Sequence, residues 1–206
     1  GTGHYWILLY HSLNKQGFDV MVMNPFDVKQ YRTIHKRGTK TDHTDASLIA
    51  KLMTEKDSYL MNDQHIDFRL RSLARAYFGL QTDIARCKNR IHRVCDILFP
   101  EFLPMFGKNK YGKPRITKTA IALLKKYPTP QKLFGEREQD IITFVQKTSR
   151  GRKDENFAIA LMQRAEYSFG MNEETEGYEF ELEHYIEQLE FLENKRKQFE
   201  ILSLIL

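Results

Sequence analysis

The stretch that decides the fold is LRSLARAYFGLQTDIARCKNRIHRVCDIL, residues 70–98. Mostly apolar residues recur in it at alternating spacings of three and four: Leu70, Leu73, Tyr77, Leu80, Ile84, Cys87, Ile91, Val94 and Leu98. This a/d pattern is sustained over about four heptads, which is typical of a helix that packs along one seam. It predicts one long helix over about 67–99, ended by Pro100.

A second seam of the same kind predicts a long helix over 178–206. Its apolar positions are Leu182, Tyr185, Leu189, Leu192, Phe199 and Leu206. Each seam needs an apolar partner, supplied either by the other helix in an antiparallel hairpin or by a second chain. Both arrangements remain open. Because a hairpin of unequal helices leaves part of a seam uncovered, we expect at least a dimer.

The segment between the seams has loop and short-helix patterns. Residues 107–115, GKNKYGKPR, predict an exposed basic loop. Shorter apolar patterns predict short helices over 116–170. The whole of 61–206 is therefore predicted to be a helical, coiled-coil assembly region.

Upstream of the long helix, the sequence predicts an α/β fragment. A helix is expected over Tyr5–Lys15, and the apolar residues 18–23 are typical of a buried strand that Asn24-Pro25 breaks. Another helix is expected to begin near Asp42. Residues 1–60 are thus interpreted as part of an α/β domain in a chain that is mostly α overall.

The charge of the chain is unevenly distributed. The 206 residues include 32 Lys+Arg and 27 Asp+Glu, but 69–118 has a net charge of +9 and 173–200 one of −7. A block this basic suits a polyanion such as nucleic acid. The alternative is that the two blocks neutralise each other in the fold. The candidate nucleic-acid-binding residues are Arg86, Lys88, Arg90, Arg93, Lys108, Lys110, Lys113 and Arg115.

Two features concern the compartment. No apolar run approaches the roughly 20 residues of a transmembrane helix, so no membrane partner is expected. Cys87 and Cys95 lie on one predicted helix about 12 Å apart along its axis, which is too far for a disulfide. Reduced cysteines are typical of a cytoplasmic protein.

One short constellation, KTDHTDA at 40–46, offers catalytic chemistry. Asp42 and Asp45 are three residues apart, so on a helix their carboxylates share a face, which suits a hard divalent cation such as Mg²⁺. The alternative is that the pair complements the amino-terminal dipole of the helix and caps its amides.

Several motifs taken together resemble the amino-terminal domain of insertion-sequence-110 family transposases, which include the Piv-type DNA invertases. In the family's order over about 1–130 they are Gly3-His4-Tyr5-Trp6, Gly17-Phe18-Asp19-Val20, Val22-Met23-Asn24-Pro25, Val28-Lys29, Lys40-Thr41-Asp42, Asp45-Ala46, Leu70-Arg71-Ser72-Leu73, Lys88-Asn89-Arg90-Ile91-His92-Arg93, Phe99-Pro100-Glu101 and Tyr127-Pro128-Thr129-Pro130.

The resemblance implies an RNase H/RuvC-like fold over 1–60, in which four acids, Asp-Glu-Asp-Asp, bind Mg²⁺ and act on DNA strands. Asp42 and Asp45 match the last two acids, and the first Asp and the Glu fall upstream of Gly1. The chain is therefore expected to be truncated at both ends and inactive alone.

The resemblance also implies partners. They are DNA, in many members a structured guide RNA, and further copies of the chain, in dimers or tetramers assembled through the long helices. A function of another class remains open: a non-catalytic dimerising coiled-coil module that binds nucleic acid and uses the Asp pair as a helix cap.

Overall fold

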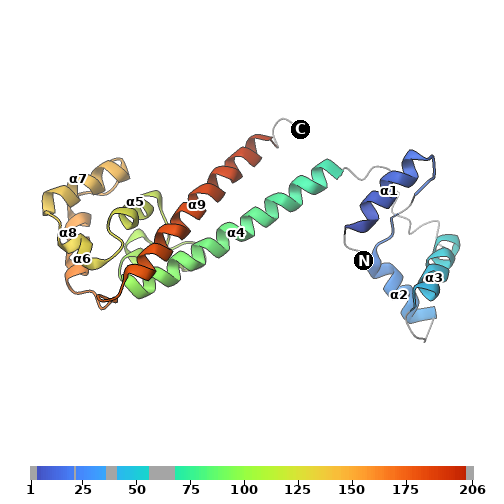
Figure 1. Cartoon of the computed structure of the whole chain (residues 1–206), viewed down its shortest axis with the longest axis horizontal. Helices are drawn as coiled ribbons and strands as arrows, with labels where there is room; N and C mark the ends of the chain where they lie inside the picture. The colour runs from blue at the N-terminus through green and yellow to red at the C-terminus, as the bar shows by residue number, and fades with distance from the viewer. Residues whose placement is uncertain (1–3, 21, 36–40, 56–67, 203–206) are drawn as a thin grey trace. The chain divides into compact units, whose positions relative to one another are not determined.

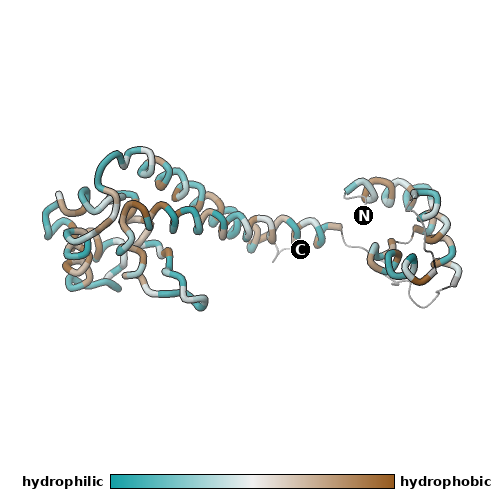
Figure 2. The backbone as a smooth tube through the Cα atoms, turned by 90° about the horizontal axis from the view of Figure 1, so that it is seen from below, coloured by the Kyte–Doolittle hydropathy of each residue, from teal (hydrophilic) through white to brown (hydrophobic). Residues whose placement is uncertain are grey.

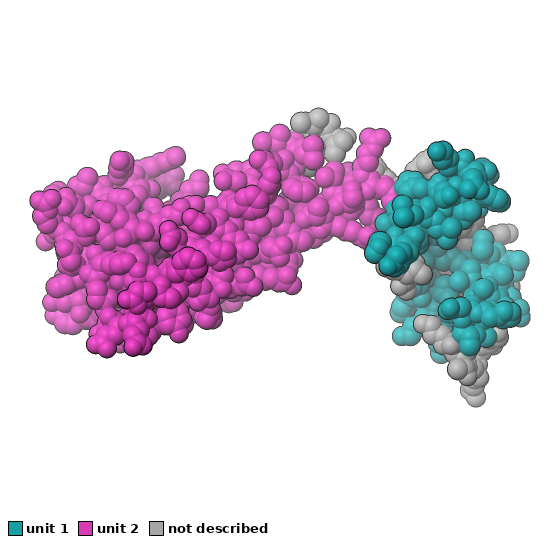
Figure 3. Space-filling view, in the orientation of Figure 1, with its two compact units in different colours: residues 1–67 teal, residues 68–206 magenta. Residues whose placement is uncertain are grey.

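The computed structural model describes residues 4–20, 22–35, 41–55 and 68–202, and these are mostly helical (Figure 1). Hydrophilic and hydrophobic residues alternate along the long helices, as expected of amphipathic helices (Figure 2). The chain divides into two compact units, 1–67 and 68–206 (Figure 3). The sequence placed this boundary near 60. None of the described helices combines the length and hydrophobicity needed to cross a bilayer.

The predicted α/β remnant of an RNase H/RuvC-like domain over 1–60 is wrong. In the described part of the first unit the chain forms helices and no strand: α1 (Tyr5–Lys15), α2 (Pro25–His35) and α3 (Asp42–Glu55). Where the strand was expected, residues 18–20 and 22–23 have irregular backbone. A strand is stable only when a neighbouring strand pairs with its backbone, and no described segment does so here. The expectation of a mostly helical chain is confirmed.

α2 begins where the sequence predicted a break. Asn24 Oδ1 accepts a hydrogen bond from the Phe26 amide (3.0 Å). Pro25 occupies the first helical position. An N–H group there has no hydrogen-bond partner within the helix, so proline, which lacks the N–H, fits without loss. Asn24-Pro25 is therefore a helix start. A small core of α2 and α3 follows from it, comprising Tyr31, Leu48 and Leu52 with Met23 and Val28 packed against them.

The second unit is built on two long helices. Its elements are α4 (Phe68–Leu98), η1 (Leu103–Phe106), α5 (Lys118–Lys126), α6 (Pro130–Phe134), α7 (Glu138–Ser149), α8 (Glu155–Glu166) and α9 (Glu176–Leu202). α4 and α9 pack against each other in antiparallel directions, because Lys88 on α4 reaches Glu193 whereas the later Arg93 reaches the earlier Glu181. The shorter helices gather at the carboxyl end of α4 (Figure 1).

The seam of α4 is buried only in its carboxyl-terminal half. Ile84, Cys87, Ile91, Val94 and Leu98 are in the core, at most 4% exposed. Leu73, Tyr77 and Leu80 are half-buried. α9 adds Leu182, Ile186 and Leu189 to the same core, so this half of the seam is covered within the chain. Leu206, the last position of the second seam, lies outside the described residues.

The segment after α8 is tied to the end of α4. Glu101 accepts a hydrogen bond from Ser168 Oγ (2.6 Å). Gly170 lies so close to Leu98 that a Cβ there would be 2.7 Å from the Leu98 carbonyl carbon and would overlap its oxygen. Only glycine fits this approach, which closes the shorter helices onto α4.

Candidate functional site

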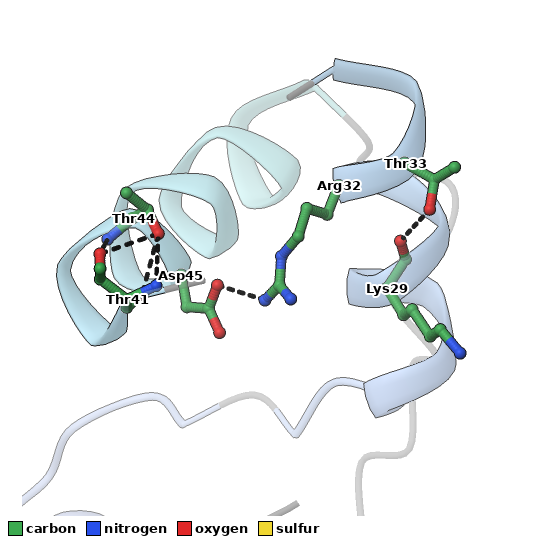
Figure 4. Close-up of polar contacts among 6 residues, drawn as sticks. All are labelled: Lys29, Arg32, Thr33, Thr41, Thr44 and Asp45. Atoms are coloured by element: carbon green, nitrogen blue, oxygen red, sulfur yellow. Dashed lines mark hydrogen bonds and ion pairs between the residues drawn. The ribbon is translucent and has the colours of Figure 1, made fainter. Parts of the chain in front are cut away.

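The two candidate acids lie in the first turn of α3. Thr41 and Thr44 cap that turn reciprocally: the Thr44 amide donates to Thr41 Oγ1 (3.2 Å) and the Thr41 amide donates to Thr44 Oγ1 (3.1 Å) (Figure 4). This arrangement is a capping box with threonine at its second position. The threonines therefore fill the capping role that was the alternative for Asp42 and Asp45.

Asp45 is directed at α2. Its carboxylate forms an ion pair with the Arg32 guanidinium (Figure 4), and the two side chains are only 22% and 24% exposed. Asp42 is exposed and forms no hydrogen bond or ion pair with any residue that the structure describes. One acid is thus held by a cation from a neighbouring helix, and the other is open to solvent.

The donors near these acids are too few for a complete metal centre. Within 4–20, 22–35, 41–55 and 68–202, no three His, Cys, Asp or Glu side chains come together closely enough to hold an ion. Asp42 and Asp45 fit a hard cation in their chemistry, but Mg²⁺ takes a near-octahedral set of oxygens.

The four candidate cations of α4 are engaged within the chain. The contacts are Lys88 Nζ with Glu193 Oε1 (2.8 Å), Arg93 with Glu181, Arg90 Cζ 5.4 Å from the centre of the Tyr185 ring, and Arg86 Nη1 with Asp83 Oδ1 (3.3 Å). Three of these four partners belong to α9. The acidic block of α9 therefore neutralises part of the basic block, which was the alternative interpretation of the charge asymmetry.

Residues 107–115 form an ordered hairpin. The Asn109 amide donates to the Lys113 carbonyl (2.8 Å), and the Arg115 amide donates to the Gly107 carbonyl (2.8 Å). These bonds hold the two arms of the hairpin together, with one isolated antiparallel bridge between Lys108 and Pro114.

The tip of this hairpin is a tight turn. The Gly112 amide donates to the Asn109 carbonyl (3.0 Å). Gly112 has a φ of +78°, a backbone conformation that residues other than glycine rarely adopt. Lys110 and Tyr111 are consequently the two central residues of the turn, where both are exposed.

The cations of the hairpin differ from those of α4 in having no acidic partner. Lys108, Lys110, Lys113 and Arg115 are exposed and form no ion pair with the described residues. The sequence has no Asp or Glu from 102 to 135. The hairpin is therefore the most concentrated unneutralised positive charge among the candidate nucleic-acid-binding residues.

His92 on α4 lies close to Lys113 and Pro114 of the hairpin. Burial of the ring lowers the pKa of His92 below its ordinary value; Asp96 opposes this, and the charge of Lys113 adds to it. The lowered pKa favours the uncharged form of the ring, so His92 adds little to the positive charge of the hairpin.

Comparison with known proteins identifies the first half of the chain. Residues 1–100 match the family model DEDD_Tnp_IS110, which is described as a transposase. This match is consistent with a fragment of an IS110-family transposase. This transposase segment contains Asp42, Asp45 and all of α4 and ends before the hairpin at 107–115, and its family points to an enzyme that processes DNA. No curated protein and no solved structure matches the chain.

Arg32 and Tyr111 were not among the residues predicted from the sequence. Arg32 was missed because Asn24-Pro25 was interpreted as a strand break; an Asn cap followed by Pro at the first helical position would have predicted α2. Tyr111 was missed because only the cations of its loop were considered, although an aromatic residue among lysines is itself a nucleic-acid signal.

Proposed function

We propose that this chain takes part in DNA transposition, with Asp42 and Asp45 acting as two of the Mg²⁺-binding acids of an IS110-family transposase. The observation that carries the proposal is the placement of the two aspartates on one turn of α3, inside the family segment, while Thr41 and Thr44 do the capping. When bound, Mg²⁺ would supply Lewis-acid chemistry at a phosphodiester. The two aspartates would bind and orient it.

The proposed partners are DNA and a structured guide RNA. The four unpaired cations of the hairpin support a polyanionic partner. The guide RNA follows from the family resemblance alone. Cys87 and Cys95 are free and buried, which supports a cytoplasmic location, where thiols stay reduced.

We further propose a homo-oligomer, a dimer or tetramer, formed through the long helices. The support is the amino-terminal half of the α4 seam, where Leu73, Tyr77 and Leu80 are only half-buried. A heptad seam that its own chain covers incompletely is suited to a second copy.

The isolated chain is proposed to be inactive on DNA, because its described residues place two candidate carboxylates on one helical turn where the family chemistry uses four. The same shortage favours a second candidate function, a non-catalytic dimerising module that binds nucleic acid. The two candidates differ in whether Asp42 and Asp45 bind a divalent cation.

Titration of the full chain with Mn²⁺, followed by electron paramagnetic resonance, tests the acidic site. We expect weak, saturable binding that Asp42→Asn and Asp45→Asn each remove. Arg32→Ala should strengthen it severalfold, because the guanidinium competes with the cation for the Asp45 carboxylate. The matched control is Asp19→Asn, which removes another exposed carboxylate of the first unit. If all four variants bind Mn²⁺ as well as the unmutated chain does, Asp42 and Asp45 do not bind the cation, and the non-catalytic candidate function is favoured.

The salt dependence of DNA binding tests the nucleic-acid interface. Replacing Lys108, Lys110, Lys113 and Arg115 together with Gln should reduce the slope of log K against log salt for duplex DNA by about 3 to 4. The same replacement of Arg86, Lys88, Arg90 and Arg93 should reduce it less, since acids and a tyrosine already engage these residues. A larger loss from the α4 set would place the phosphates on α4 instead.

A further inference from the structure

We infer that the hairpin at 107–115 binds a single-stranded stretch of nucleic acid, with Tyr111 stacked on an unpaired base and the cations of the arms on the neighbouring phosphates. This inference rests on the proposed nucleic-acid function and deepens it, because it names the form of nucleic acid that this element recognises.

The first observation is the exposure of Tyr111 on an ordered turn. Its side chain is 76% exposed. Asn109 Oδ1 accepts hydrogen bonds from the amides of Tyr111 (2.8 Å) and Lys113 (3.1 Å), which fixes the backbone beneath the ring. The exposed ring contributes little to the core, and because the turn beneath it is already ordered, a ligand that covers the ring does not have to order the backbone.

The second observation is the arrangement of cations around the ring. Lys110 Nζ lies 4.9 Å from the centre of the Tyr111 ring. Lys113 and Arg115 are two residues apart on an extended arm, so they share a face at about 7 Å, a separation similar to that of neighbouring phosphates in a single strand. Pro114 between them is half-buried and pairs with Lys108 across the hairpin. The two cations of the arm are exposed to solvent.

These features favour a single strand over a duplex. Bases in a duplex are stacked on each other and offer phosphates but no free ring face, whereas an unpaired base can stack on an aromatic side chain. The cations serve either form. Only the single strand uses Tyr111, and this difference makes the inference testable.

The experiment compares the full chain and its variants on three fluorescent probes: a mixed-sequence RNA strand, a DNA strand of the same sequence, and the fully paired DNA duplex. Tyr111→Ala should weaken single-strand binding by about 5- to 100-fold, the effect of losing one stacked base. Tyr111→Ala should leave the affinity for the duplex unchanged. The salt dependence of binding to single strands and to the duplex should also stay the same, because the substitution removes no charge. Tyr111→Phe should retain the binding, since stacking does not need the hydroxyl.

The matched control is Tyr167→Ala, which removes a similarly exposed tyrosine (79%) from the same unit. The inference is overturned if Tyr111→Ala binds the single strands as tightly as Tyr167→Ala does, or if Tyr111→Ala weakens binding to single strands and to the duplex equally. It is also overturned if Tyr111→Phe loses as much single-strand affinity as Tyr111→Ala. In these cases salt-dependent binding by the unmutated chain still supports the proposed function. An unmutated chain that binds none of the probes rejects both.

The two single strands identify the source of the unpaired base. Tighter binding to the RNA strand than to the DNA strand, with Tyr111 sensitivity in both, indicates a guide RNA recognised through its 2′-hydroxyls as well. Equal binding indicates that the hairpin accepts any exposed strand, including one opened in the DNA.

Discussion

Gly170→Ala is expected to destabilise the second unit by about 3 kcal/mol. The added Cβ would lie 2.7 Å from the Leu98 carbonyl carbon and overlap its oxygen. Neither partner can easily withdraw, because Leu98 is fully buried at the end of α4 and the backbone on the other side is tied to Glu101 through Ser168. Urea unfolding of the full chain, followed by far-ultraviolet circular dichroism, measures the loss.

The matched control is Gly79→Ala on α4, where an added Cβ meets nothing within 4 Å. Alanine is the better helix former, so this variant should gain up to about 1 kcal/mol. The two Gly→Ala changes therefore have opposite expected signs. A Gly170→Ala protein as stable as the unmutated chain would show that the segment after α8 does not pack on α4 as described.

The long helices were predictable because their signal is local. A residue's helical neighbours are three and four positions away, so the pattern at 70–98 located α4, Phe68–Leu98, without knowledge of any partner. The strand over 18–23 was predicted from an equally apolar pattern, but its existence depends on a pairing segment elsewhere. No described segment provides one, and the pattern by itself could not reveal that.

Prolines caused the misplaced boundaries. Asn24-Pro25 was interpreted as a strand break, yet it begins α2, and Thr129-Pro130 begins α6 in the same way. Thr129 Oγ1 accepts a hydrogen bond from the Lys132 amide (3.4 Å), as Asn24 does from the Phe26 amide. A polar cap followed by Pro is a start signal whenever an apolar helical face follows it, and that test was available from the sequence.

The candidate site was predictable in part. Spacing and resemblance selected Asp42 and Asp45, and the structure places them in one helical turn. The sequence could not show that Arg32 pairs with Asp45 across 13 positions. Nor could it decide which cations the acids of α9 would neutralise, because that depends on how α4 and α9 align.

Ile84→Asp is expected to unfold the α4–α9 pair, at a cost of about 4 kcal/mol or more. Ile84 is 4% exposed in the core of the second unit. The substitution removes its packing and leaves a carboxylate without a partner in an apolar environment. Because α9 covers this part of the seam within the same chain, the expected result is loss of helix content at every protein concentration, measured by circular dichroism.

Leu73→Asp, on the same seam but half-buried, is the matched comparison and is expected to act on assembly instead. If the half-buried part of the seam meets a second copy, the new charge should convert the oligomer to a monomer while helix content stays, as measured by light scattering coupled to size exclusion. A monomeric unmutated chain would refute the proposed oligomer and leave the Ile84 prediction intact. If the Ile84→Asp protein instead dissociates but keeps its helices, the buried half of the seam lies between chains. That result would contradict the contact of Cys87 on α4 with the Tyr185 carbonyl on α9 in the same chain (3.1 Å).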